Sequence, residues 1–346
     1  MRVALTAGKG QMELRELPEP EAGPGQVVLR VGVVGLCGGD IHIYRGEHPY
    51  ATYPLVQGHE FCGSVLSFGP GYEGPLRLGD LVAVEPLLPC GGCFACRRGH
   101  PNCCVGLKVM GAHVGGALAE QVAVPVSSCY PVGDLPPELA ALVEPISIGL
   151  QAVVRSGATM GDQMLVLGAG PIGQAVTVCA VDRGAEVMVV DKLENRLELA
   201  TQLGASLVTD VTRASVDEAV FAWTGGDGPA IVVDATGVPA LIRLAADVVA
   251  PSGTVVVVGI SLNAVALSVV DFTRKELNVL GSRNNAGLFA DAVQIVQRSA
   301  DRVARLITHR FPFEEAPRAM EFLRDHPEQA EKVLVLVDER MRGEQA

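Results

Sequence analysis

The sequence predicts an α/β protein that combines a doubly wound parallel sheet with a β-rich, barrel-like lobe. Three observations predict this fold class. A glycine-rich turn follows an apolar run at 166–173. Strand-like and helix-like segments alternate from about residue 160 onward. Residues 1 to about 150 contain short apolar segments separated by Gly and Pro, which is typical of an antiparallel lobe.

The predicted strands of the first lobe lie at 26–34, 60–68 and 81–85, between turns at 23–25, 69–71 and 79–80. We expect this lobe to be all β and barrel-like. In the second part, the predicted strands lie at 163–167, 186–190, 206–209, 230–234, 254–259 and 277–280, with helices such as 193–203 and 240–249 between them. After 281–282, two helical segments and a final strand at 332–337 should pack back on the first lobe. The predicted domains are therefore 1–150 completed by 285–346, and 151–284.

Bulk composition restricts the possible partners. The 346 residues are 49% hydrophobic, and 27 basic against 39 acidic side chains give a net charge of −12. Such a charge argues against nucleic acid or an anionic membrane as partner. Without a long uncharged apolar run or a secretion signal at the start, the chain is expected to be cytoplasmic.

The glycine-rich turn has the spacing of a dinucleotide-binding (Rossmann) motif, with Gly168, Gly170 and Gly173. Pro171 and Ile172 would open a helix whose N–H groups face a pyrophosphate. The alternative is a tight turn without a ligand. Asp191, at the end of the next strand, favours a turn that binds a dinucleotide. It also favours NAD over NADP, since a carboxylate accepts hydrogen bonds from ribose hydroxyls and repels a 2′-phosphate. Lys192 and Arg196 lie close enough to weaken that preference.

Four cysteines, Cys90, Cys93, Cys96 and Cys104, form a compact cluster in the sequence. Zn²⁺ prefers four tetrahedral thiolates in structural sites, and two-residue gaps allow such thiolates to converge. The spacing therefore predicts a structural zinc site rather than buried free thiols. Spacing alone also allows Cys103 as the fourth ligand in place of Cys104.

A second cluster of residues with chemically active side chains is dispersed along the chain: Cys37, Asp40 and His42, then His59 and Glu60, then Glu144. A catalytic zinc needs three protein ligands and an open position. Cys37, His59 and either Glu60 or Glu144 would serve, although each has an ordinary structural interpretation. Their spacing along the chain does not indicate that they are close in space.

The chain resembles the medium-chain zinc-dependent alcohol dehydrogenase family over nearly all of its length. The resemblance rests on Cys37-Gly38-x-Asp40-x-His42, Gly58-His59-Glu60, the cysteines at 90–104, Glu144-Pro145 and the glycines at 168–173. It implies a GroES-like catalytic domain, a Rossmann domain, NAD, two zinc ions per chain and a homodimer or homotetramer. Glu144 in place of a cysteine resembles polyol (sorbitol) and threonine dehydrogenases. The segments 101–104, 109–113, 281–284 and 308–313 resemble bacterial L-galactonate 5-dehydrogenases.

The resemblance also implies the reaction, in which a secondary alcohol is oxidised to a ketone with hydride transfer to NAD⁺. It implies that the far ring nitrogen of His59 donates a hydrogen bond to the Asp40 carboxylate, and it gives His42 a place in a proton relay. This chain departs from the family at Gly39, where a Ser or Thr hydroxyl usually starts that relay. Water, Glu144 or His42 would then take the proton.

Substrate contacts are predicted for Arg283 above all, because a guanidinium can bind a carboxylate or paired hydroxyls. Asn284, His113 and Tyr44 are further candidates. A polyol or sugar acid of the L-galactonate type is the leading substrate, with L-threonine 3-dehydrogenase or sorbitol-type activity as alternatives. A catalytically silent protein that binds zinc and dinucleotide is the alternative from another class, and Gly39 is its only support.

Overall fold

The structure is a computed structural model that describes residues 1–49 and 51–338. The chain forms two compact units. Of the described residues, the first contains 1–49, 51–144, 289–300 and 307–338, and the second contains 145–288 and 301–306. Within the described residues, no helix is both long and apolar enough to cross a membrane.

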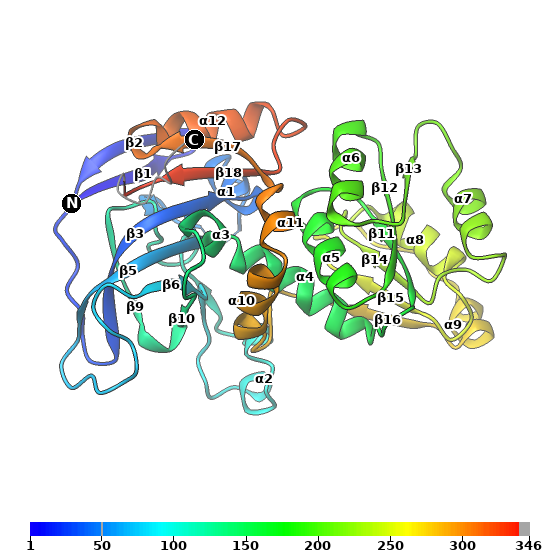
Figure 1. Cartoon of the computed structure of the whole chain (residues 1–346), viewed down its shortest axis with the longest axis horizontal. Helices are drawn as coiled ribbons and strands as arrows, with labels where there is room; N and C mark the ends of the chain where they lie inside the picture. Colours follow the sequence, from blue (N-terminus) through cyan, green and yellow to red (C-terminus); the bar gives the residue numbers. More distant parts are fainter. Residues whose placement is uncertain (50, 339–346) are drawn as a thin grey trace. The chain divides into compact units, whose positions relative to one another are not determined.

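The first unit is built around β3 (Gln26–Leu36), which pairs antiparallel with three strands. One edge of β3 is occupied by β5 (Glu60–Phe68). The other edge is shared by β9 (Gln121–Pro125) near its start and β18 (Lys332–Leu336) near its end. The end of β3 therefore lies beside the first residues of both β5 and β18 (Figure 1).

The rest of the first unit completes this sheet and adds two small ones. The sheet order is β10-β6-β5-β3-β18-β17, and β2-β1-β4 and β7-β8 are separate. The strands are β1 (Arg2–Gly8), β2 (Gln11–Glu16), β4 (Leu55–Val56), β6 (Leu81–Val84), β7 (Leu87–Leu88), β8 (Lys108–Val109), β10 (Cys129–Pro131) and β17 (Ile307–Pro312); the helical segments are α1 (Gly38–Tyr44), α2 (Phe94–Arg97), η1 (Pro101–Cys103), η2 (Val126–Ser128), α3 (Pro137–Ala141), α10 (Phe289–Arg298), η3 (Phe313–Glu315) and α12 (Ala316–Asp325). The core joins side chains of β3, β5 and β18, such as Val34, Phe61 and Val333.

Two predictions for this unit were wrong. The lobe is not all β, because α1 begins directly after β3. A helix of seven residues is too short to show a periodic pattern, but Cys37 and Asp40 form a capping box at its start. In addition, the described chain after 282 forms three α-helices instead of the predicted two, and the unpredicted strand β17 lies between α11 (Ala300–Ala304) and α12. The first four residues of β17 alternate between half-buried and exposed, as on an edge strand, and only Phe311 is buried, which gives a weak apolar signal. As predicted, the final strand packs on the first lobe.

The second unit is a six-stranded parallel sheet in the order β13-β12-β11-β14-β15-β16. This is the strand order of the doubly wound dinucleotide-binding fold. Its strands are β11 (Gln163–Leu167), β12 (Glu186–Asp191), β13 (Leu207–Asp210), β14 (Ile231–Asp234), β15 (Thr254–Val257) and β16 (Asn278–Gly281); its helices are α5 (Pro171–Asp182), α6 (Glu194–Leu203), α7 (Val216–Trp223), α8 (Pro239–Val248) and α9 (Val269–Lys275), and α4 (Val143–Ser156) and α11 (Ala300–Ala304) each contribute most of their length. Helices cover the sheet in Figure 1. All six predicted strands are present within two residues of their predicted limits.

Candidate metal and dinucleotide sites

Cys37 and His59 meet at the end of the central strand of the first unit. Cys37 follows β3, and His59 precedes its neighbour β5, so the sheet pairing brings together residues that are distant in sequence. The Cys37 Sγ lies 3.1 Å from His59 Nε2. Together with a carboxylate oxygen of Asp40, these ligand atoms lie within 4.8 Å of one another.

Asp40 is fully buried and supports both residues. Its Oδ2 accepts a hydrogen bond from the Cys37 N–H at 3.0 Å, and its Oδ1 lies 3.7 Å from His59 Nδ1. The predicted hydrogen bond from His59 to Asp40 is thus an ion-pair contact beyond hydrogen-bond distance. Gln57 donates to the Asp40 carbonyl and accepts from Thr6 Oγ1 at 2.6 Å. Sequence reasoning missed Gln57 and Thr6, and the only available signal was the position of Gln57 before Gly58-His59.

The charges at this site attract a cation. Burial raises the pKa of the Cys37 thiol, which the charge of His59 offsets only in part. Burial by itself lowers the pKa of His59, but the negative charges of Cys37 and Asp40 outweigh it and raise this pKa well above its usual value. His59 Nδ1 is buried without a hydrogen-bond partner in the described chain. A thiolate and an imidazole nitrogen in such surroundings suit Zn²⁺, which prefers S and N ligands.

Two buried carboxylates accompany this pair, and neither belongs to the 4.8 Å group. Glu60 pairs with Lys332 of β18, and each side chain is only 2% exposed. Burial raises the pKa of Glu144 to about 7, with Glu60 adding to the shift while His59 and Lys332 oppose it. Both carboxylates therefore remain candidates for the third metal ligand. Sequence reasoning missed Lys332, which lies far from both in the chain.

The four-cysteine cluster also comes together in the structure. One ligand atom from each of Cys90, Cys93, Cys96 and Cys104 lies within 4.8 Å of the others. Cys104 is buried and accepts the Cys90 N–H, whereas Cys103 is exposed and outside the cluster. Backbone N–H groups of Cys96 and Val105 lower the pKa of Cys93 to about 6, which favours the thiolate form that zinc binds. The structure thus selects Cys104 over Cys103 as the fourth ligand.

We predict that Cys96→Ser removes one zinc ion per chain and lowers Tm by roughly 5 °C or more, because the loop has only a small apolar cluster around Leu87 and Leu107 to hold it. Metal analysis and calorimetry measure both effects. Cys103→Ser is the matched control and should leave two zinc ions and an unchanged Tm. Equal zinc loss in both variants would contradict the assignment.

The glycine turn of the second unit joins β11 to α5. Gly168 has a φ of +94°, which favours glycine, and Gly170 caps the helix that begins at Pro171. A Cβ on Gly173 would lie 1.9 Å from the Gly168 carbonyl oxygen, whereas one on Gly170 would meet only Arg196, at 3.6 Å. The third glycine is thus needed for packing, and the second keeps the backbone accessible to a ligand. Ile172 is half-buried in the first helical turn.

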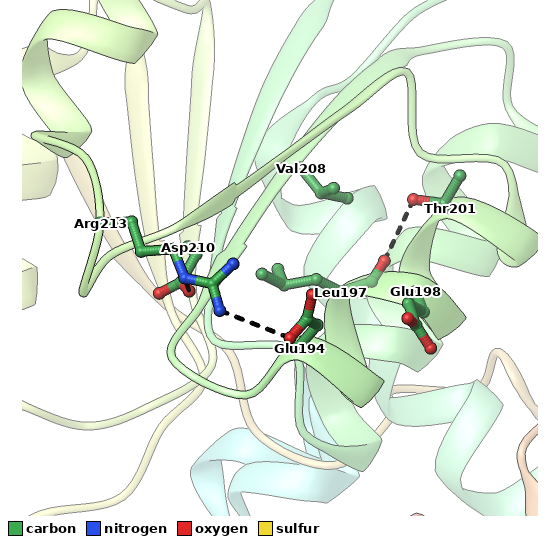
Figure 2. A pocket seen from close by; sticks show the side chains of 7 residues that line it. All are labelled: Glu194, Leu197, Glu198, Thr201, Val208, Asp210 and Arg213. Carbon is green, nitrogen blue, oxygen red and sulfur yellow. Dashed lines mark hydrogen bonds and ion pairs between the residues drawn. The ribbon is translucent and has the colours of Figure 1, made fainter.

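Asp191, at the end of β12, is hydrogen-bonded to this turn. Its Oδ2 accepts from the Ala169 N–H at 2.7 Å, and its Oδ1 accepts from the N–H groups of Lys192 and Leu193. Asp210, at the end of the neighbouring strand β13, is the register partner of Asp191. A surface depression beside β13 carries Asp210, Glu194 and Glu198, and its one arginine, Arg213, pairs with Asp210 and Glu194 (Figure 2).

The predicted relay and substrate residues have varied surroundings. His42 is exposed, and its Nδ1 lies 3.0 Å from Glu47 Oε2. Tyr44 is buried, and its hydroxyl donates to the Gly10 carbonyl at 2.9 Å, which indicates a packing role instead of the predicted substrate contact. His113 accepts the Val109 N–H and packs edge-on against His48. Arg283 is exposed and Asn284 half-buried, both after β16 of the second unit.

Comparison with known families bears directly on these sites. Residues 23–134 match the sequence model of the Alcohol dehydrogenase GroES-like domain, and residues 171–298 match that of the Zinc-binding dehydrogenase family. The chain belongs to the medium-chain zinc-dependent alcohol dehydrogenase family. It is therefore a zinc-type oxidoreductase that uses a nicotinamide dinucleotide, with a GroES-like domain and a Rossmann domain.

Relatives within the alcohol dehydrogenase family differ in substrate. The chain is 36% identical to L-galactonate-5-dehydrogenase of Escherichia coli K12 over 301 residues, which covers 86% of this chain and 87% of that protein. It is 33% identical to sorbitol dehydrogenase of Bombyx mori, covering 96% of this chain and 98% of that protein. It is 32% identical to L-threonine 3-dehydrogenase of Pyrococcus furiosus, covering 90% of this chain and 92% of that protein.

Solved structures of similar dehydrogenases contain both kinds of cofactor. The RspB protein of Escherichia coli CFT073, complexed with NADH, has a TM-score of 0.91 at 31% identity, covering 97% of this chain and 99% of that one. A zinc-binding dehydrogenase of Sinorhizobium meliloti 1021, bound to NADP, has a TM-score of 0.91 at 29% identity with the same coverage. Similarity to these structures therefore does not distinguish NAD from NADP, and the cofactor preference must be inferred from the residues of this chain.

Proposed function

We propose that this dehydrogenase oxidises a secondary alcohol of a polyol or sugar acid of the L-galactonate type, with NAD⁺ as the hydride acceptor. The observation that carries the proposal is the half-buried Cys37–His59 pair accompanied by two buried carboxylates, Glu60 and Glu144. A simple-alcohol enzyme has a cysteine at the position of Glu144. We assign the catalytic zinc domain to 1–150 with 285–346, and the cofactor domain to 151–284. When bound, zinc supplies Lewis-acid chemistry, which favours loss of the alcohol proton.

The side chains of the first unit would hold the metal and keep its ligands oriented. Cys37 and His59 supply S and N ligands, and either Glu60 or Glu144 supplies the third. Asp40 faces His59 Nδ1, so the imidazole presents Nε2 on the side of the Cys37 thiolate. The alcohol proton would leave through water, Glu144 or His42, since Gly39 offers no hydroxyl.

The second unit would hold NAD⁺ on the glycine turn. The Gly168–Gly173 turn leads into α5, and its N–H groups would face the pyrophosphate. Asp191 still has acceptor capacity on Oδ2, which has one hydrogen bond, and would accept the ribose hydroxyls.

The substrate is tested by a panel of aldonates, polyols and L-threonine with NAD⁺, followed by NADH absorbance. Sugar acids are favoured by the similarity to L-galactonate-5-dehydrogenase and by Arg283, whose guanidinium would bind a carboxylate. Oxidation of L-threonine alone would replace this proposal with the threonine 3-dehydrogenase alternative. A chain that holds two zinc ions but oxidises no member of the panel would support the catalytically silent alternative.

Asp191 should make NAD⁺ the preferred cofactor. We expect kcat/KM for NAD⁺ to exceed that for NADP⁺ by about tenfold or more, because Asp191 repels a 2′-phosphate and Asp210 adds negative charge beside it. Asp191→Asn should lower kcat/KM for NAD⁺ by about 10- to 100-fold through loss of a charged hydrogen bond. The ratio of kcat/KM for NAD⁺ to kcat/KM for NADP⁺ should therefore fall in the same variant. Asp210→Asn is the control and should change the ratio much less; an equal change in both variants would contradict the role of Asp191.

The missing hydroxyl at Gly39 leads to a further prediction. A Cβ at this position would lie 3.3 Å from Cys37 Sγ and 3.8 Å from His59 Cε1, so a serine here would bring its hydroxyl to the metal ligands. We expect Gly39→Ser to keep or raise kcat, by at most about 100-fold, because it restores the start of a proton relay. Gly38→Ser, where nothing lies within 4 Å, should leave kcat unchanged. A more than tenfold loss in Gly39→Ser alone would show that the hydroxyl is excluded for function.

A further inference from the structure

Gln174 is a fully buried polar side chain behind the glycine turn of the second unit. It is the fourth residue of α5. Its Nε2 donates to the Ala169 carbonyl at 3.1 Å and to the Arg196 carbonyl at 2.8 Å. A buried amide is costly unless it is hydrogen-bonded, so these two bonds explain why a polar side chain is tolerated here. Gln174 therefore connects the glycine turn to α6, the helix that neighbours α5 (Figure 1).

Ala169, inside the glycine turn, is held through both of its backbone polar groups. Its N–H donates to Asp191 Oδ2 at 2.7 Å, and its carbonyl accepts from Gln174. The other carboxylate oxygen of Asp191 accepts from the N–H groups of Lys192 and Leu193, which lead into α6. The glycine turn, the acidic residue at the end of β12 and the start of α6 thus form one hydrogen-bonded unit, and Gln174 closes it.

The neighbours of Gln174 fix the orientation of its amide. Both partners are carbonyl oxygens, which can only accept hydrogen bonds, so the NH₂ group must face them. The Oε1 atom is buried and has no hydrogen-bond partner among the described residues. An unpaired buried acceptor destabilises a fold, and an apolar side chain of similar size would avoid that cost. The amide is therefore explained by the connection it makes and not by packing.

This connection places Arg196 beside the second glycine of the turn. A Cβ on Gly170 would meet Arg196 Nη1 at 3.6 Å. The guanidinium thus lies where a pyrophosphate that approaches Gly170 would meet it, and a guanidinium binds phosphate through two parallel hydrogen bonds. Since Gln174 bonds to the backbone carbonyl of Arg196, the position of the guanidinium depends on the amide of Gln174.

We propose that Gln174 is a positioning residue for the cofactor, which holds the Arg196 guanidinium at the pyrophosphate and away from a 2′-phosphate. This inference rests on the proposed use of NAD⁺ and is independent of the identity of the alcohol substrate. Gln174 then affects both the affinity for NADH and the discrimination against NADPH. Without the amide, α6 is released from the glycine turn, and the guanidinium can turn toward a phosphate on the ribose beside Asp191.

The first test measures the Kd values of NADH and NADPH by fluorescence titration of the full chain without substrate. Gln174→Met removes the amide and keeps an unbranched side chain. It should raise the Kd for NADH by about tenfold, because a charged hydrogen bond to the pyrophosphate is misplaced. The Kd for NADPH should stay within about threefold, because the guanidinium gains the 2′-phosphate. Equal increases in both Kd values, or no change in either, would overturn the proposal.

Thr177→Val is the matched control for Gln174→Met. Thr177 is fully buried one turn later in α5, and its Oγ1 donates to the Gly173 carbonyl at 2.9 Å. This exchange also removes a buried hydrogen bond from α5, but it leaves α6 attached to the glycine turn. Both Kd values should therefore equal those of the wild type. The same change of preference in Thr177→Val would overturn the proposal, because any disturbance of α5 would then suffice.

The second test separates positioning from stability. Arg196→Ala removes the guanidinium but keeps the backbone carbonyl that accepts from Gln174. Adding Gln174→Met to Arg196→Ala should lower Tm as much as it does in the wild type, yet change the Kd for NADH by less than about twofold. A tenfold increase that persists in Arg196→Ala would overturn the proposal. If Gln174→Met does not fold, Gln174→Asn replaces it in the same comparison, because the shorter side chain withdraws the amide from both carbonyls.

The outcome for the proposed function is read separately. A wild-type chain that binds NADPH more tightly than NADH would contradict the proposed use of NAD⁺. The loss of the Gln174→Met effect in Arg196→Ala tests the role of Gln174 by itself, since it compares Kd values for one cofactor only.

Discussion

Cys37→Ala is expected to reduce zinc content from two ions to one per chain and to lower kcat/KM by about 10³-fold or more. Cys37 supplies the one thiolate of the catalytic site, and it lies 3.1 Å from His59 Nε2. Without it, the remaining ligands bind the cation poorly, and several kcal/mol of transition-state stabilisation are lost. Metal analysis and initial rates with the best substrate of the panel measure the two effects together.

The control for Cys37→Ala is another thiol of the same unit. Cys62 is fully buried on β5, and its Sγ contacts the Pro137 carbonyl oxygen at 3.2 Å, outside both cysteine sites. Cys62→Ala should cost some stability because it leaves a small cavity, but it should retain two zinc ions and most activity. If Cys37→Ala retains two zinc ions, the catalytic metal site is placed wrongly.

The second and third glycines of the dinucleotide turn, Gly170 and Gly173, should respond to alanine in different ways. In Gly173→Ala, the new Cβ would lie 1.9 Å from the Gly168 carbonyl oxygen, so α5 must move away from β11. We expect a loss of about 3 kcal/mol or more of unfolding free energy, a fall in Tm of roughly 10 °C. Thermal unfolding monitored by circular dichroism measures this change.

Gly170→Ala is the matched partner of that substitution. Its φ of −72° suits alanine, and the new Cβ would lie 3.6 Å from Arg196. Tm should therefore fall by only about 2–3 °C, because alanine in place of glycine at a helix N-cap costs about 1 kcal/mol. The same methyl group should block close approach of the pyrophosphate and raise the Kd for NADH by about tenfold or more, as measured by fluorescence titration. Unchanged NADH binding would contradict the assignment of the turn.

The predictions that succeeded depend on residues close together in sequence. The strand at 163–167, the glycine turn and the helix after Pro171 form one continuous stretch, so their pattern is complete in the sequence. The four cysteines at 90–104 have the same advantage. The buried runs of β12 and β15 could be recognised because both faces of each strand are covered.

The predictions that failed involve short or half-exposed elements. α1 has seven residues, and its main signal is the capping box formed by Cys37 and Asp40. β17 lies at the edge of the sheet, and its first four residues alternate between half-buried and exposed, so the motif at 308–313 gives little indication of a strand. Tyr44 was proposed for substrate, yet it belongs to the core, because residue type alone does not tell which side of a short helix faces inward.

The sequence by itself determined the family, the two-part α/β architecture, the four-thiolate cluster and the dinucleotide turn, because each depends on local spacing. Only the tertiary structure decided how Cys37, His59, Glu60 and Lys332 meet. These residues lie at the end of β3 and at the starts of its two neighbours, so antiparallel pairing brings them together. It also decided for Cys104 over Cys103 and placed Asp191 on the Ala169 amide. Such contacts depend on strand register, which spacing along a chain does not encode.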